Sequence, residues 1–514
     1  MEVTPTEGDV HLRKMSEKPI ERVPSQSQGT VLPVKGIRGG IDPNLRLVEE
    51  AVEAIGFGKF QWQLTLLCGF GFLVDQMILV SISLVTPQAS MEFGPRYATL
   101  LSAPQYAGLL VGAVVLGGLA DNLGRKLVWQ TSILGVSIFA MIAASAPSWA
   151  ALNVFITLMG LFGGGNLAID LTILVESIPR QWTFILSGLA CIWGLGNAIT
   201  GLIAWPLIVN FGCPSGSTPA NCPKPANMGW RYLYITLGGL CLVMALVRVL
   251  LLRARESPRW LISCGRVSEA VATLNSIAAT NGSDYRLNVD QFTVSAVTEN
   301  KEVRSVRENV RRAVNLFSGA QNLRLMLCLV VIWATIGIAY PLYTIFLPYY
   351  LSAHGASLGE DSNYITYRDW SVSSVVGIFG PFVSMYMVSY RHLRSRRSIL
   401  LTGAACAAFS GAFTSVRTAG QNLAFSCMIN FWLNALYAIV YSYTPQALSV
   451  ENRGLGNGLL MAVGRLASLS APFIATFADV TTSAPIWVSC GCYIVIGLVA
   501  LVLPVDTVPF GDDV

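Results

Sequence analysis

Long apolar stretches separated by polar turns run through most of this chain. A bilayer core of about 30 Å is crossed by roughly 20 apolar residues in a helix. Twelve stretches reach that length, with approximate limits 62–86, 100–120, 127–146, 150–175, 183–210, 231–252, 323–349, 369–389, 398–416, 421–445, 456–478 and 484–504. They do not alternate polar and apolar residues as membrane-barrel strands would. The pattern therefore predicts an all-α membrane protein with twelve transmembrane helices.

Polar segments divide these stretches into two sets of six. The N-terminal segment is rich in Pro, Ser and Gly and has no short apolar core, so we expect a mostly disordered tail without a cleavable signal peptide. After the sixth stretch, Val267, Val271, Leu274 and Ala278 recur at helical spacing, which predicts short amphipathic helices. The expected organisation is a tail (1–58), a six-helix half (59–252), a central loop (253–322), a second half (323–505) and a C-terminal tail (506–514).

Composition supports a membrane protein and excludes several functions. The chain is 53% hydrophobic and 12% charged, whereas a soluble domain is about 25% charged. The net charge of +5 does not come from one basic stripe, so we expect no nucleic-acid partner. The sequence contains no nucleotide loop, metal-ligand cluster or nucleophile–base pair. We therefore expect no enzyme activity, no metal and no cofactor. The expected partners are the lipid bilayer and a small-molecule substrate, with no obligatory protein partner.

The distribution of lysine and arginine predicts the orientation of the helices. Cytosolic loops carry an excess of these residues. Of the 34 in the chain, 28 fall on one face, including the N-terminal tail and the segment from Arg248 to Arg324, and five fall on the other. The remaining one, Arg465, lies inside a span. Both termini and the central loop are therefore expected in the cytosol.

Two further features bear on this orientation. Cys213 and Cys222 share a loop on the less basic face, where a disulfide suits an oxidising compartment; two free thiols are the alternative. The glycosylation sequon at Asn281 falls in the predicted cytosolic loop and should stay unmodified.

The turn between the second and third spans has an unusual pattern. Gly117, Asp121, Gly124, Arg125 and Lys126 read G-x-x-x-D-x-x-G-R-K and join two apolar helices through a short charged turn. This pattern resembles the loop between helices two and three of the major facilitator superfamily of secondary transporters. The resemblance implies two pseudo-symmetric six-helix halves that work by alternating access. It also implies that this turn is a latch on the cytosolic side.

Other motifs resemble one branch of that superfamily. Glu256-Ser257-Pro258-Arg259-Trp260-Leu261 after span six, and Tyr441 to Gln446 with Arg453 after span ten, look like motifs of sugar porters and synaptic-vesicle-type transporters. The segment Gly56 to Trp62 before span one resembles fungal members of the synaptic-vesicle and aromatic-acid branch. These likenesses cover residues from about 56 to 504.

Several positions depart from the sugar-porter pattern. Span seven contains no Gln or Asn between Arg324 and Tyr350, where hexose carriers hold sugar hydroxyls. Ile156 stands where sugar porters place an arginine in span four. The second latch keeps Arg396 and Arg397 but lacks the Asp and Gly of the first. These departures argue against hexose as the substrate.

The resemblance also assigns a cytosolic gate. Glu176 at the end of span four occupies the family position that meets Arg125, and Arg453 is expected to join them. Together the expected gate residues are Gly117, Asp121, Gly124, Arg125, Lys126, Glu176, Glu256, Arg259, Arg396, Arg397 and Arg453.

Three ionisable residues fall inside spans, where charge is costly and commonly functional. Asp75 lies near the middle of span one, and a carboxyl group at that depth can take up and release a proton; a structural carboxylate is the alternative. Arg465 in span eleven is expected to balance Asp75 or an anionic substrate, with snorkelling as the alternative. Asp170 is expected to be a second proton site or to face a water-filled cavity.

Aromatic and amide residues complete the expected substrate and proton pathway. They suit a planar or amphipathic ligand, although helix packing explains any single one of them. They are Asn166, Trp193, Asn197, Tyr340, Tyr343, Asn430, Asn434, Tyr437 and Tyr441.

The sequence as a whole predicts a secondary transporter for a small organic solute. We expect a carboxylic or aromatic acid, or a related nutrient, moved by alternating access with the proton gradient as driving force. The expected location is the plasma membrane, with the vacuole as the alternative. Export of a secondary metabolite or toxin, sugar transport and a non-transporting sensor are the alternatives.

Overall fold

The structure is a computed structural model, and it describes residues 43–182, 185–251, 256–292, 311, 314–344, 347, 363–390, 392–448, 453–478 and 482–504. These residues form helices and connecting turns, without a strand among them. The predicted C-terminal tail, residues 1–42 and nearly all of the charged stretch 301–312 lie outside the described residues.

The first half contains the six predicted spans. They are α2 (Lys59–Phe93), α3 (Ser102–Leu123), α4 (Arg125–Ala143), α5 (Trp149–Ser177), α6 with α7 (Ile185–Gly188 and Ala190–Phe211) and α8 (Gly229–Leu251). Helix α5 begins after Ser148, whose side chain accepts a hydrogen bond from the Ala151 amide at 3.3 Å and so caps the helix. Helices α3 and α5 pack so closely that a Cβ at Gly112 would meet the backbone of Leu161, which is how small residues join membrane helices.

The second half contains the other six. They are α12 (Ala320–Thr344), α14 with α15 (Asn363–Gly377 and Gly380–Ser389), α16 (Arg394–Phe413), α17 (Ala419–Ala447), α18 with α19 (Arg453–Ser468 and Ala471–Phe477) and α20 (Ala484–Val502). Among the described residues, eleven spans are long and apolar enough to cross a bilayer. The twelfth, α16, opens with Arg394, Arg396 and Arg397, which lower its mean hydropathy. The predicted twelve-helix fold is confirmed.

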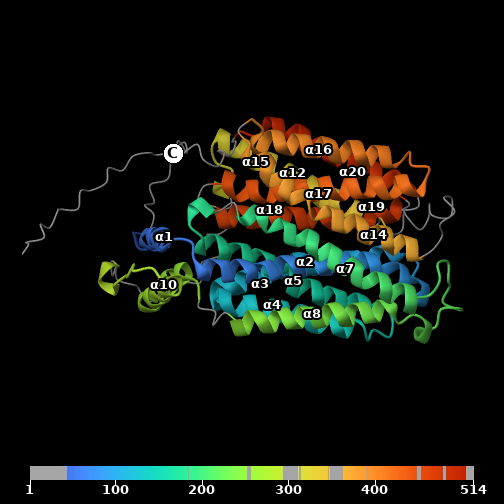
Figure 1. The fold of residues 1–514 in the computed structure, drawn as a ribbon, viewed down its shortest axis with the longest axis horizontal. Helices are drawn as coiled ribbons and strands as arrows, with labels where there is room; N and C mark the ends of the chain where they lie inside the picture. The colour runs from blue at the N-terminus through green and yellow to red at the C-terminus, as the bar shows by residue number, and fades with distance from the viewer. Residues whose placement is uncertain are drawn as a thin grey trace, which may run out of the picture. The chain divides into compact units, whose positions relative to one another are not determined.

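The two halves meet through matching pairs of helices (Figure 1). Helix α3, second in its half, packs on α18, fifth in the other half, and α7, fifth in its half, packs on α14, second in the other. This exchange of places is the relationship expected of two structural repeats that surround a central site. The first-half helices appear blue to green in Figure 1 and the second-half helices yellow to red.

Helix α2 is the most buried span of the described chain. Its most apolar window is 94% buried, whereas the other spans reach 67% at most. It packs against α5, α7 and α8, so polar groups on it are enclosed by protein. Other spans keep apolar outer faces, with Leu250 75% and Phe477 82% exposed, as contact with lipid tails would allow.

Three short helices lie at one end of the spans (Figure 1). Helix α1 (Pro43–Ile55) packs on α9 (Pro258–Ser263) and α10 (Val267–Asn281) through Val48, Ala51 and Leu274. The Asn281 Oδ1 atom accepts the Phe60 amide at 2.9 Å and so ties α10 to the start of α2. Residues 43–55 are thus helical, in a segment for which the sequence predicts mostly disorder, because the apolar face of α1 is covered by α9 and α10.

Candidate functional site

An ion pair between the two halves lies at the middle of the spans. Asp75, near the midpoint of α2, and Arg465 of α18 are joined by the Arg465 Nη2 atom, which lies 3.3 Å from both carboxylate oxygens. The Asp75 side chain is only 3% exposed, whereas Arg465 is 18% exposed. The cation therefore keeps some accessible surface while its partner is buried. The sequence places both residues at mid-depth and predicts that Arg465 balances either Asp75 or an anionic substrate; the structure shows the contact with Asp75.

Polar groups surround this pair. The Gln76 Nε2 atom donates to the Asn197 Oδ1 atom at 2.8 Å and also contacts the Tyr340 hydroxyl, so these three side chains join α2, α7 and α12. The Tyr106 phenol of α3 lies near both Asp75 and Arg465. Gln76 and Tyr106 were not among the sequence candidates. An amide next to Asp75 inside an apolar span is the signal that could have found Gln76.

Aromatic rings form a wall beside the ion pair. Tyr437 and Tyr441 of α17 stack with ring centroids 5.3 Å apart. Trp193 of α7 meets Tyr441 edge-on at 4.4 Å, and Trp333 of α12 meets it at 4.6 Å. Tyr340 lies 4.8 Å from Tyr437. Rings from both halves thus converge, and we call Asp75, Gln76, Asn197, Arg465 and these rings the central site.

The remaining pathway candidates lie outside the central site. Tyr343 is buried in the second half, with its hydroxyl 3.5 Å from the Ser426 carbonyl oxygen. The Asn430 Nδ2 atom donates to Ser373 at 3.1 Å, and Asn434 donates to the Asn430 carbonyl oxygen at 2.8 Å. These three residues hold α12, α14 and α17 together. Helix packing, the alternative named for any single candidate, accounts for their contacts.

Asp170 and Asn166 belong to a second polar cluster inside the first half. Asp170 pairs with Arg248 of α8 at 3.0 Å, and both side chains are 0% exposed. Arg248 also donates to the Asn166 Oδ1 atom at 3.0 Å. The structure therefore does not place Asp170 beside an open cavity. Arg248, counted with the cytosolic residues from sequence, is instead buried, because three helices supply oxygens that replace its water.

The predicted latch is built around two carboxylates. The Glu256 Oε1 atom accepts the backbone N–H of Arg125 at 2.9 Å and of Lys126 at 3.2 Å. It thus caps the first turn of α4, where a negative charge is favoured by the helix dipole. Glu176 pairs with the Arg125 guanidinium and accepts the Ser257 hydroxyl at 2.8 Å. We call this end of the spans the latch end.

The described arginines among the other predicted gate residues bond groups outside the Arg125–Glu176 pair. Arg259 pairs with Glu49 of α1 at 3.1 Å. Arg396 donates to the Leu501 carbonyl oxygen at 2.5 Å, and Arg397 to that of His392 at 2.5 Å, so both bond backbone oxygens here. A Cβ at Gly117 would meet no atom within 4 Å. The side chains of Asp121 and Arg453 lie outside the described part of the structure.

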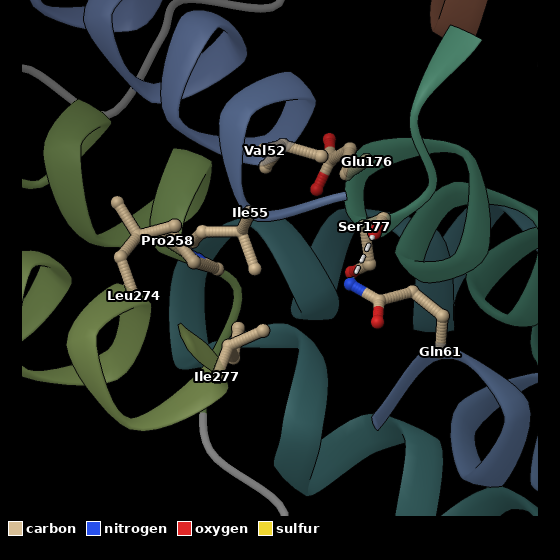
Figure 2. A pocket seen from close by; sticks show the side chains of 8 residues that line it. All are labelled: Val52, Ile55, Gln61, Glu176, Ser177, Pro258, Leu274 and Ile277. Atoms are coloured by element: carbon tan, nitrogen blue, oxygen red, sulfur yellow. Dashed lines mark hydrogen bonds between the residues drawn. The ribbon is translucent and has the colours of Figure 1, made fainter. Parts of the chain in front are cut away.

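A small pocket opens beside the latch (Figure 2). It has an empty volume of about 260 Å³, part of it open to solvent. Apolar side chains of α1, α9 and α10 face Glu176, Ser177 and Gln61 across it. The Gln61 Nε2 atom donates to the Ser177 carbonyl oxygen at 3.4 Å, which links α2 to the end of α5. The short helices therefore lie directly against the latch.

A disulfide marks the opposite end of the spans. Cys213 is bonded to Cys222, and the Cys213 carbonyl oxygen accepts Asn363 of α14 at 2.8 Å, across the two halves. Nearby, Arg231 pairs with Glu92 at 2.7 Å, with both side chains buried. The cysteine pair was predicted from the sequence, but this ion pair was not. Arg231 and Glu92 each lie at the end of a span, where a charged side chain is expected to be solvated. We call this the disulfide end.

Comparisons with known proteins agree with the fold. Residues 64–472 match the family described as Major Facilitator Superfamily. The chain is 32% identical to "MFS siderochrome iron transporter 1" of Ceriporiopsis subvermispora (strain B), over 91% of this chain and 92% of that protein. It is 27% identical to "Niacin transporter NiaP" of Acinetobacter baylyi, over 83% and 89%.

A solved structure shares the fold. The xylose transporter XylE from E. coli, in a partially occluded inward-open conformation, superposes with a TM-score of 0.63 at 14% identity, over 86% of this chain and 98% of that one. At that identity the likeness concerns the fold alone. The family match and the first of these relatives each cover most of the chain. This chain therefore belongs to the major facilitator superfamily and is a multi-pass membrane transporter, not an enzyme.

Proposed function

We propose that this transporter moves a small organic acid together with a proton, and that the anion binds Arg465 in the central site. The observation that carries the proposal is the exposure of the ion pair: Arg465 keeps accessible surface although its partner Asp75 is buried. A guanidinium has five N–H donors, and only the Nη2 atom bonds Asp75 among the described residues. The other donors suit a carboxylate, which arginine binds in a bidentate manner.

Proton coupling follows from competition for that one cation. An ionised Asp75 holds Arg465, and a protonated Asp75 releases it to the anion. Proton and anion would then bind together and cross the membrane as a neutral pair. This avoids the cost of moving net charge through a low-dielectric site.

The aromatic wall selects the shape of the solute. Tyr437, Tyr441, Trp193 and Trp333 present ring faces and edges within one cluster, and such surfaces hold planar ligands. Gln76 and Asn197 add amide groups that can orient a ring heteroatom. An aromatic carboxylate fits this combination of charge and planarity. The relative named as a niacin transporter supports the choice, because niacin is such an acid.

Alternating access follows from the position of the site between two structural halves. The latch end is assigned to the cytosol because the excess of lysine and arginine lies there, and the disulfide end to the opposite side. The plasma membrane is the expected location, with import as the expected direction.

The experiment is uptake of labelled solutes by cells that produce the protein, with and without a proton uncoupler. Nicotinate and nicotinamide form a matched pair that differs in the carboxylate, and xylose is the neutral sugar comparator. We expect uptake of nicotinate or benzoate that collapses with uncoupler, with nicotinamide and xylose excluded. Uptake of xylose alone would favour the sugar alternative. Lowered retention of a preloaded acid would favour export.

A further inference from the structure

Among the described residues of the first half, two arginine–carboxylate pairs are buried, and the hydrogen bonding of their carboxylates differs. In both pairs, Asp170–Arg248 and Glu92–Arg231, the side chains are at most 7% exposed. Burying two charges costs more than their attraction returns unless hydrogen bonds satisfy the remaining atoms. The hydrogen bonds made by each carboxylate therefore indicate whether the pair is structural or can take up a proton.

The Glu92 carboxylate is fully bonded. Its Oε1 atom accepts the Arg231 Nη2 atom at 2.7 Å. Its Oε2 atom accepts the Arg231 Nη1 atom at 2.7 Å and the Trp230 indole at 3.2 Å. A proton added to either oxygen would displace one of these donors. This pair therefore fits a permanent structural role.

The Asp170 carboxylate is only half bonded. Its Oδ1 atom accepts the Trp129 indole and, at 3.0 Å, the Arg248 Nη2 atom. Its Oδ2 atom is fully buried and accepts no N–H or O–H donor among the described residues; the Cys68 thiol, a weak donor, faces this carboxylate. An ionised oxygen left in this state is unfavourable, because a buried polar group without a hydrogen bond has lost its water without a replacement partner. A proton on this oxygen would remove its charge without displacing an N–H donor.

Arg248 does not depend on the charge of Asp170. Its guanidinium also donates to the Leu67 carbonyl oxygen at 2.9 Å, the Trp129 carbonyl oxygen at 3.1 Å and the Asn166 Oδ1 atom at 3.0 Å. It further lies 4.2 Å from the centroid of the Trp129 ring, a favourable cation–π arrangement. These groups would hold the cation in either state of Asp170.

From these contacts we infer that Asp170 is a proton-binding site of its own, separate from Asp75, with the Oδ2 atom as the acceptor. The ligand is a single proton, which converts the cluster from a neutral ion pair to one net positive charge on Arg248. The titratable and charged groups that face Asp170 in the described chain are Arg248 of α8 and the Cys68 thiol of α2; the Trp129 indole of α4 is the other polar contact.

The location gives the site a role in the transport cycle. A Cβ at Gly71 would collide with Asp170, and Gly71 lies one helical turn before Asp75 on α2. On the other side, α5 carries both Asp170 and the latch residue Glu176. A proton held here therefore lies on helices that carry both the central site and the latch.

The test is infrared titration of the purified full-length protein, with aspartate carboxyl groups labelled with carbon-13. Protonated buried carboxylic acids give a separate C=O stretching band, and the label moves the aspartate part of it. We expect Asp170→Asn to remove one labelled component and Glu92→Gln to leave the aspartate band unchanged. An aspartate band that is the same in wild type and Asp170→Asn would overturn the proposal.

A second variant covers the case in which Asp170→Asn does not fold. The buried aspartates of the described chain are Asp75, Asp170 and Asp369. In Asp75→Asn/Asp369→Asn, we expect one buried aspartate C=O band that grows on acidification; the absence of such a band at every pH would refute the site. No solute is needed, so this result is independent of the acid proposed above. A band lost only in Asp75→Asn would refute Asp170 and leave the central site intact.

Discussion

The Arg465 Nη2 atom of α18 lies 3.3 Å from both carboxylate oxygens of Asp75 on α2, so the two halves of the transporter share one ion pair. An ion pair between the halves favours the conformation in which they are held together. Neutralising either residue removes that preference. A proton on Asp75 and an anion on Arg465 both remove this attraction. The same event would therefore bind the solute and free the halves to move.

Replacing Arg465 by Gln should strongly weaken binding and uptake of the acid. A hydrogen bond to a charged group contributes about 1.5–3 kcal/mol, so apparent affinity should fall roughly 10- to 100-fold. Lysine should restore part of the binding, because it keeps the charge but not the bidentate geometry. Uptake of labelled nicotinate measures this. Arg417→Gln, which changes an exposed arginine before α17, is the control and should transport normally. Equal loss in both variants would contradict the role of Arg465.

The Asp75–Arg465 pair also predicts a rescue. Arg465→Gln alone leaves Asp75 buried and unpaired, which lowers stability. Asp75→Asn with Arg465→Gln should recover a stable protein that still fails to bind the acid. Thermal denaturation in detergent, with binding measured in parallel, separates the two effects. Recovery of binding in the double variant would show that the solute does not use Arg465.

Gly124 is required by the turn between α3 and α4. Its φ of +104° and ψ of 149° lie in a region open almost only to glycine, and a Cβ there would lie 2.6 Å from the Glu256 Oε2 atom. Gly124→Ala should lower stability by about 1–3 kcal/mol. Gly117→Ala is the matched control in the same motif, since a Cβ at Gly117 meets no atom within 4 Å. Thermal denaturation measures the difference. Equal denaturation temperatures for Gly124→Ala and Gly117→Ala would refute this account.

The latch pair Arg125–Glu176 should respond to charge exchange. Glu176→Gln removes a charged partner of Arg125 while the Ser257 hydroxyl can still bond the amide, so we expect roughly tenfold slower uptake. Arg125→Glu with Glu176→Arg should recover part of the rate, because the attraction is restored. Glu49→Gln, which changes the pair with Arg259 at α1, is the control and should have a smaller effect. Absence of recovery would argue against a direct gate contact.

The proposed orientation predicts the chemical state of Asn281 and of the cysteine pair Cys213 and Cys222. Asn281 bonds the Phe60 amide and Gln61 at the latch end, so it should carry no glycan in a eukaryotic host. Cys213 and Cys222 should resist alkylation until the protein is reduced. Glycosidase digestion and mass spectrometry read both outcomes. A glycan on Asn281 would place the latch end outside the cytosol.

The sequence predicted the spans well because their signal is local. Twenty apolar residues in succession are sufficient evidence for a membrane helix. The motif from Gly117 to Lys126 lies within ten residues, so it is also readable from sequence. The partners of buried charges are not local. Arg465 lies 390 residues from Asp75 and Arg248 lies 78 from Asp170. Arg248 resembled a cytosolic residue because it lies near the end of α8 and close to other arginines.

Helix α1 was missed for a related reason. Its charged residues and short length are typical of a disordered tail, and only packing on α9 and α10 covers Val48, Ala51 and Ile55. The aromatic wall was predicted in part, since Trp193, Tyr340, Tyr437 and Tyr441 were candidates. Nothing in the sequence separated these rings from Tyr343, which packs within the second half.

Transport by the purified protein in liposomes tests the central claim most directly. Wild type and Asp75→Asn would be compared for accumulation of labelled nicotinate under an imposed pH gradient, and for exchange of nicotinate with no gradient. The account predicts that wild type performs both, and that Asp75→Asn exchanges nicotinate but no longer accumulates it. Gradient-driven accumulation that survives in Asp75→Asn would contradict the account.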